Sequence, residues 1–156
     1  MKTKAYKPNK NTSGSVKEPM VSYGATAVQQ YVTQGDYALV KKARQGMDTT
    51  LFYTLSQSLN IPEKTLASVI NLSPRTISNY REQQKTLDPN YSEHLLKIAN
   101  LYSLGQEIFG TLDEFNQWME RPFYNSKECP KDFLNTYAGV ELIIQEIEKL
   151  AQGYPV

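Results

Sequence analysis

The sequence predicts an all-α protein. In several segments, apolar residues recur at intervals of three and four, the spacing that places them on one face of a helix. Residues that commonly begin or end helices, such as Asp, Ser, Pro and Gly, flank these segments. Strand signals are weak, because the sequence contains no alternating apolar and polar run bounded by a hairpin turn.

Charge is unevenly distributed along the chain. Residues 1–46 contain 8 Lys and Arg against 2 Asp and Glu, a net charge of +6. Residues 47–100 contain 5 of each sign, and residues 101–156 carry −5, from 4 basic and 9 acidic side chains. This gradient indicates that the N-terminal part of the chain tolerates a polyanion and that the C-terminal part faces a different partner. The alternative is an ordinary solvated surface.

Residues 1–35 are expected to form a flexible basic arm. Lys, Asn, Thr, Ser and Pro dominate residues 1–19, and large apolar side chains are few. Such a segment buries too little surface to offset the entropy that is lost on ordering. A plain tail is the favoured interpretation, and an arm that contacts phosphates is the alternative.

Two short helices are expected between residues 36 and 62. Asp36 is a candidate N-cap for the first helix, and Gly46 is a natural end for it. The second helix starts at Asp48, and Pro62 separates it from the next segment.

The most informative stretch is residues 63–82, EKTLASVINLSPRTISNYRE. Ala67 is small enough for two crossing helices to approach closely, and Asn71 tolerates the left-handed backbone of a tight turn. Ser73 caps the following helix, whose first position is Pro74. The side chains expected to face the core are Leu66, Ala67, Ile70, Ile77 and Tyr80. This pattern predicts a helix-turn-helix of the phage-repressor type, in a domain of residues 36–104 that binds DNA and dimerises.

The polar residues left on the outside of the second helix are suited to DNA. Arg pairs with guanine and Asn with adenine in the major groove, whereas Ser and Thr contact phosphates or base edges. The candidate DNA-binding residues are Ser73, Arg75, Thr76, Ser78, Asn79, Arg81 and Lys85. The alternative is a helical hairpin that exposes Arg and Asn without binding DNA.

Residues 105–156 are expected to form a small second helical domain. The long helix that leads into this domain ends at Gly110. Thr111 then caps a short helix that contains the single Trp. Gly139 precedes the last helix, whose apolar residues lie on one face, and Gly153 ends it.

This half of the chain resembles the C-terminal domain of Xre/MbcA/ParS-type antitoxins, the partners of RES-domain toxins. The residues that carry the resemblance are Ile108, Phe109, Gly110, Phe115, Trp118, Met119, Pro122, Pro130, Asp132, Phe133, Leu134, Gly139, Leu150 and Gly153. Their order and spacing, with a helix-turn-helix upstream, extend the resemblance over residues 36–156. The segment between Pro122 and Pro130 lacks the glycines often found there, and the N-terminal arm has no clear counterpart.

The resemblance implies a homodimer that binds a RES toxin, which consumes NAD, and that represses its own operon at operator DNA. It also implies that the C-terminal end covers the entrance of the toxin's active site. The residues expected to contact the toxin are Gln152, Gly153, Tyr154, Pro155 and Val156. The alternative function is a stand-alone helix-turn-helix transcriptional regulator without a toxin partner.

Catalysis is not expected. The single His94 lies in an apolar helical stretch, and the single Cys129 has no adjacent base, so the sequence predicts no enzyme, no metal site and no cofactor. A single cysteine fits a reducing cytosol. No apolar run approaches the roughly 20 residues that span a bilayer, so we expect a cytoplasmic protein without a membrane partner.

Overall fold

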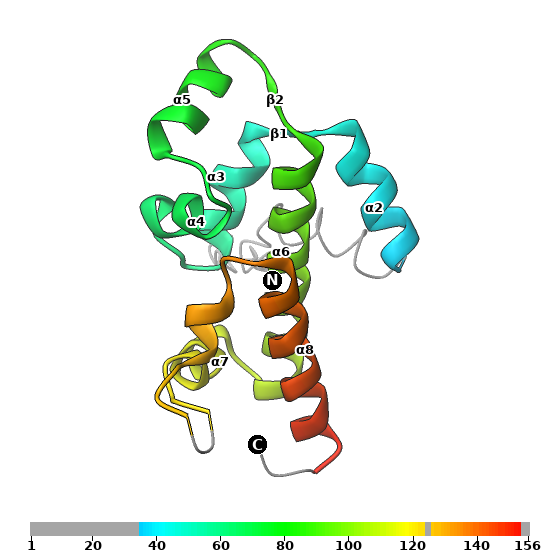
Figure 1. Cartoon of the computed structure of the whole chain (residues 1–156), viewed down its shortest axis with the longest axis vertical. Helices are drawn as coiled ribbons and strands as arrows, with labels where there is room; N and C mark the ends of the chain where they lie inside the picture. The colour runs from blue at the N-terminus through cyan, green and yellow to red at the C-terminus, as the bar shows by residue number, and fades with distance from the viewer. Residues whose placement is uncertain (1–34, 124–125, 154–156) are drawn as a thin grey trace, which may run out of the picture.

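The structure is a computed structural model that describes residues 35–123 and 126–153. It confirms the all-α fold, since helices dominate the described ranges (Figure 1). The elements are α2 (Asp36–Gln45), β1 (Met47–Asp48), α3 (Thr49–Ser58), α4 (Glu63–Val69), α5 (Pro74–Glu82), β2 (Thr86–Leu87), α6 (Pro89–Phe109), α7 (Leu112–Met119), the 3-10 helix η1 (Pro130–Phe133) and α8 (Tyr137–Ala151). None of the described helices is long and apolar enough to span a membrane.

Helix α6 forms the centre of the molecule, and α2, α7 and α8 all pack against it (Figure 1). Buried side chains occur on more than one of its faces, as expected for a helix that is surrounded by others. Its buried residues are Ser92, His94, Leu95, Leu96, Ile98, Ala99, Leu101, Tyr102 and Gly105. At Gly105 the two helices α6 and α7 meet closely, because a Cβ there would lie 2.6 Å from the ring of Phe115.

A two-residue antiparallel pair of strands, which the sequence did not indicate, ties α2 to α6. Met47 pairs with Leu87 in β1 and β2. The buried Ser92 of α6 supports this pair, since its Oγ accepts from the Met47 N–H at 2.9 Å and donates to the Leu87 carbonyl at 3.1 Å. Gly46 is required beside it, because its φ is 77° and a Cβ would lie 2.8 Å from the Leu87 oxygen.

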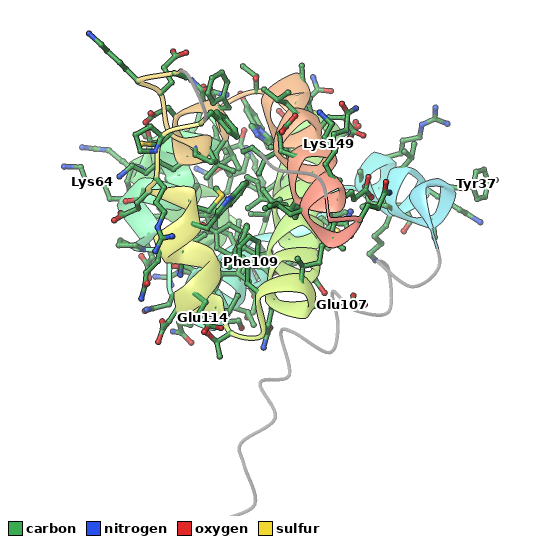
Figure 2. The ribbon with its side chains drawn as sticks, turned by 90° about the horizontal axis from the view of Figure 1, so that it is seen from below. Tyr37, Lys64, Glu107, Phe109, Glu114 and Lys149 are labelled. Atoms are coloured by element: carbon green, nitrogen blue, oxygen red, sulfur yellow. The ribbon has the colours of Figure 1, made fainter. Side chains whose placement is uncertain are left out.

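The start of α2 differs from the prediction by one residue. Gly35, and not Asp36, is the N-cap, and its carbonyl accepts from the Ala38 N–H at 3.2 Å. Asp36 is therefore the first helical residue. Tyr37 on the outer side of α2 points away from the rest of the protein and is 82% exposed (Figure 2).

The start of α8 also differs from the prediction. The helix begins at Tyr137, and the Thr136 side chain caps it by accepting from the Gly139 N–H at 3.0 Å. Gly139 therefore lies inside the first turn and does not precede the helix. It packs directly on η1, because a Cβ there would lie 1.9 Å from the Phe133 carbonyl oxygen.

One hydrophobic core extends through both halves of the described chain. It includes Phe52 of α3, Ile77 of α5, Phe115 of α7 and Ile143 of α8 in a single cluster. Helix α6 is continuous across residues 104 and 105, where the sequence suggested a domain boundary. The division into domains therefore stays a prediction. We call residues 35–104 the N-terminal lobe, and residues 105–123 and 126–153 the C-terminal lobe.

Candidate nucleic-acid interface

The turn between α4 and α5 has the predicted geometry. Asn71 adopts a φ of 59°, the left-handed conformation expected there. The chain reverses tightly, because the Leu72 N–H donates to the Ala67 carbonyl at 2.9 Å. Ala67 is fully buried where α4 and α5 cross. The Asn71 side chain also donates from Nδ2 to the Asn135 carbonyl at 3.1 Å, so the turn is tied to the loop before α8.

Ser73 begins α5 as predicted, with Pro74 in the first turn. The Ser73 Oγ accepts from the Thr76 N–H at 3.0 Å and lies 2.8 Å from the Thr76 Oγ1. These contacts satisfy one of the free N–H groups at the helix start. Both hydroxyls therefore hold the helix terminus in position, a positioning role beside the predicted DNA contact.

Helix α5 presents its polar face outward. Ile77 is fully buried, whereas Arg75 and Asn79 are exposed and Ser78 is half-buried. An open recess runs along this face, and its lining residues are Tyr53, Glu63, Pro74, Arg75, Ser78, Asn79, Arg81 and Glu82. The structure thus brings four of the predicted residues to one surface, at one end of the molecule (Figure 1).

Sequence reasoning missed a contact that orients one of these residues. The Arg81 guanidinium lies over the Tyr53 ring of α3, 4.6 Å from its centroid. Such a contact restrains a long side chain that would otherwise sample many rotamers. Tyr53 gave no signal in the sequence, because its proximity to Arg81 depends on how α3 packs on α5.

The charge of this surface is moderately positive. Residues 63–85 contain 4 basic side chains and 2 acidic ones. Glu82 accepts from the Ser78 hydroxyl at 3.5 Å and reduces the positive charge next to Arg81. Lys85 lies just beyond α5 and is exposed. Few cations mean few phosphate contacts for one copy, so two copies bound together would bind DNA much more tightly.

The predicted toxin-binding residues lie elsewhere. Gln152 and Gly153 follow α8 and are exposed, and Gly153 has the left-handed φ of 82° expected of a helix stop. Tyr154, Pro155 and Val156 lie outside the described residues. The last turn of α8 and helix α5 lie at opposite ends of the molecule (Figure 1). The two candidate sites are therefore separate.

His94 and Cys129 both have structural contacts. The buried His94 donates from Nε2 to the Leu134 carbonyl at 2.8 Å and so joins α6 to the segment after η1. Burial lowers the pKa of His94 below its ordinary value. The Cys129 N–H donates to Asp132 Oδ2 at 2.8 Å, and its Sγ donates to the Glu120 carbonyl. Within residues 35–123 and 126–153, no three His, Cys, Asp or Glu residues are grouped in a way that could hold a metal ion.

Comparison with known families agrees with this geometry. Residues 38–100 match the family described as the antitoxin Xre-like helix-turn-helix domain. The matched range contains α3, α4, α5 and all the candidate DNA-binding residues. None of the curated proteins matches the chain. Residues 38–100 are therefore similar to the helix-turn-helix domain of Xre-like antitoxins.

Proposed function

We propose that this protein is an antitoxin that binds and neutralises a RES-type, NAD-consuming toxin and represses its own operon through the helix-turn-helix. The observation that carries the proposal is the match of residues 38–100 to an antitoxin family. The toxin class rests on the resemblance of the C-terminal half. In this proposal the protein itself performs no catalysis, because the NAD-consuming chemistry belongs to the toxin.

The DNA-binding part is supported by the surface of α5. Arg75 and Asn79 are exposed on the helix that enters the major groove in this motif. Arg81 is held by its contact with Tyr53. We assign base reading to Arg75 and Asn79, and backbone contacts to Arg81 and Lys85. A homodimer would place two such helices on a two-part operator.

The toxin-binding part is supported by the separation of the two candidate sites. Because the end of α8 lies far from α5 (Figure 1), a toxin bound there leaves the DNA-reading face uncovered. Gln152 and Gly153 are exposed and follow a helix that is well anchored in the core. We propose that residues 152–156 extend from this anchored helix into the toxin's active-site entrance.

The test is to express the neighbouring gene in a bacterial host and measure cellular NAD with and without this protein. We expect NAD to collapse with the neighbouring gene alone and to recover on co-expression. Unchanged NAD in both cases would contradict the pairing with a NAD-consuming toxin. The stand-alone regulator would then be the better interpretation.

Two variants separate the two activities. A chain lacking residues 153–156 should fold and bind DNA but fail to restore NAD, because it lacks the segment that covers the active site. Arg75→Ala should restore NAD fully but weaken operator binding. Full protection by the truncated chain would show that the toxin is blocked through another surface.

A further inference from the structure

A cavity of about 430 Å³ lies between the helix-turn-helix and the C-terminal lobe. Helices α4, α6 and α7 line it, together with the segment before α4 and residues of and after η1. This volume is within the range of small-molecule sites, roughly 300–1,000 Å³. Apolar side chains make up much of its wall, among them Ile61, Leu66, Val69, Ile98, Met119 and Leu134.

Tyr102 of α6 gives this cavity a polar group. The residue lines the cavity and is only 5% exposed, and its hydroxyl has no hydrogen-bond partner among the described residues. Every fully enclosed side-chain polar atom in those residues does have a partner. The Tyr102 hydroxyl must therefore reach open space, and the cavity is the space that this side chain lines.

The phenol is available as a hydrogen-bond donor. Burial raises the pKa of Tyr102 to about 12, so the hydroxyl keeps its proton at neutral pH. An acceptor on a molecule bound in the cavity would satisfy this donor.

The charges around the cavity disfavour an anion. Two carboxylates, Glu120 and Asp132, line it with a single ammonium group, that of Lys131. Lys131 Nζ lies 3.3 Å from Glu120 Oε1, so its charge is already neutralised by a close partner. The amides of Asn60 and Asn116 are the remaining polar side chains of the wall apart from Thr65.

We propose that this cavity is a binding site for a small neutral molecule that has an apolar body and one hydrogen-bond acceptor, with the acceptor held by the Tyr102 hydroxyl. The site belongs to neither the DNA-binding nor the toxin-binding residues. A molecule bound there contacts α4, which leads through the Asn71 turn into α5, and also the segment around η1. Occupancy would therefore stiffen the junction between the two lobes.

The experiment uses the full chain labelled with ¹³C at the methionine methyl groups, since Met119 lines the cavity. Acetophenone, which carries a carbonyl acceptor, and ethylbenzene, which has a similar shape but no acceptor, are titrated separately. We expect saturable shifts of the Met119 methyl signal with both compounds. Tyr102→Phe should weaken acetophenone binding about threefold to tenfold, the range of one net hydrogen bond, and leave ethylbenzene binding unchanged.

Further variants test the location. Val69→Phe should fill the cavity and abolish the binding of both compounds. Thr65→Trp, at the exposed rim of the cavity, is the alternative cavity-filling variant if Val69→Phe fails to fold. Tyr91→Phe removes a hydroxyl from outside the cavity and should leave both affinities unchanged. The proposal is overturned if neither compound gives a saturable shift, if Tyr102→Phe leaves acetophenone binding unchanged, or if binding survives a folded cavity-filling variant.

Discussion

Helices α5 and α8 are anchored in the same way. Each begins with a hydroxyl N-cap, Ser73 or Thr136, whose side chain accepts the N–H three residues on. Each buries an isoleucine completely, Ile77 in α5 and Ile143 in α8, in the same core cluster. Amphipathic packing and capping therefore account for both helices equally and do not distinguish their functions.

The two helices differ in the charge they expose. Helix α5 carries two arginines and one glutamate, whereas α8 carries three glutamates and one lysine. The lysine of α8, Lys149, lies 2.6 Å from Glu146, and Lys97 of α6 lies 3.6 Å from Glu141. Glu148 of α8 and Glu93 of α6 therefore set the sign of this surface. A polyanion is attracted to α5 and repelled by α8. The exposed residues, and not the anchoring, determine which partner each helix can take.

The largest expected effect tests the shared anchoring. Ile77→Ala and Ile143→Ala should each lower the free energy of unfolding by about 2–5 kcal/mol, because each leaves a cavity in a packed core. Urea denaturation followed by circular dichroism measures this. Since one cluster contains both residues, a single unfolding transition is expected in each variant. Two separate transitions would show that the two lobes unfold independently, so that α5 and α8 would belong to two separate domains.

The next effect tests the difference in charge. Arg75→Ala and Asn79→Ala should each weaken specific operator binding by about 1–3 kcal/mol, the value of one bidentate base contact. Fluorescence anisotropy with labelled operator DNA at fixed salt measures the change. Lys149→Ala on α8 is the matched control and should leave the affinity unchanged. A loss with Lys149→Ala as large as with Arg75→Ala would mean that DNA contacts the other end of the molecule.

A smaller effect compares the two caps. Ser73→Ala and Thr136→Ala should each cost about 1 kcal/mol of stability, the typical value of an N-cap side chain. Thermal unfolding of each variant measures this loss of stability. Thr136→Ser should keep most of the stability that Thr136→Ala loses. Ser73→Ala should in addition reduce DNA affinity, because Ser73 positions the start of the reading helix. Normal DNA affinity in that variant would remove Ser73 from the interface.

The smallest effect concerns pH. Burial lowers the pKa of His94 below its ordinary 6.5, although the hydrogen bond to Leu134 and the charge of Glu93 oppose this. Below pH 6.5 the unfolded chain therefore binds more protons than the folded one, and the free energy of unfolding falls as the pH falls. Urea denaturation between about pH 5 and 8 tests this. His94→Gln should make the free energy of unfolding less dependent on pH in that range. An unchanged pH dependence in this variant would mean that other titratable groups cause it.

Local signals predicted much of the candidate DNA-binding site. The turn at Asn71 and the cap at Ser73 depend on the preferences of one residue and its near neighbours, which are visible in the sequence. The same holds for Asp48, the N-cap of α3, and for Gly153, which follows the end of α8 with a positive φ. The one-residue error at Gly35 is of the usual size for a helix boundary, since several residues can act as an N-cap.

The sequence by itself determined the helical fold, the turn chemistry and the polar face of α5, because these follow from residue spacing and from contacts a few positions apart. The tertiary structure alone decided the pairing of β1 with β2, the contact of Arg81 with Tyr53, the close packing of Gly139 on Phe133 and the cavity at Tyr102. Most of these join residues that are distant in the chain, and all depend on how whole elements pack against one another. Such packing is fixed by the combined shape of many side chains, which no local pattern records.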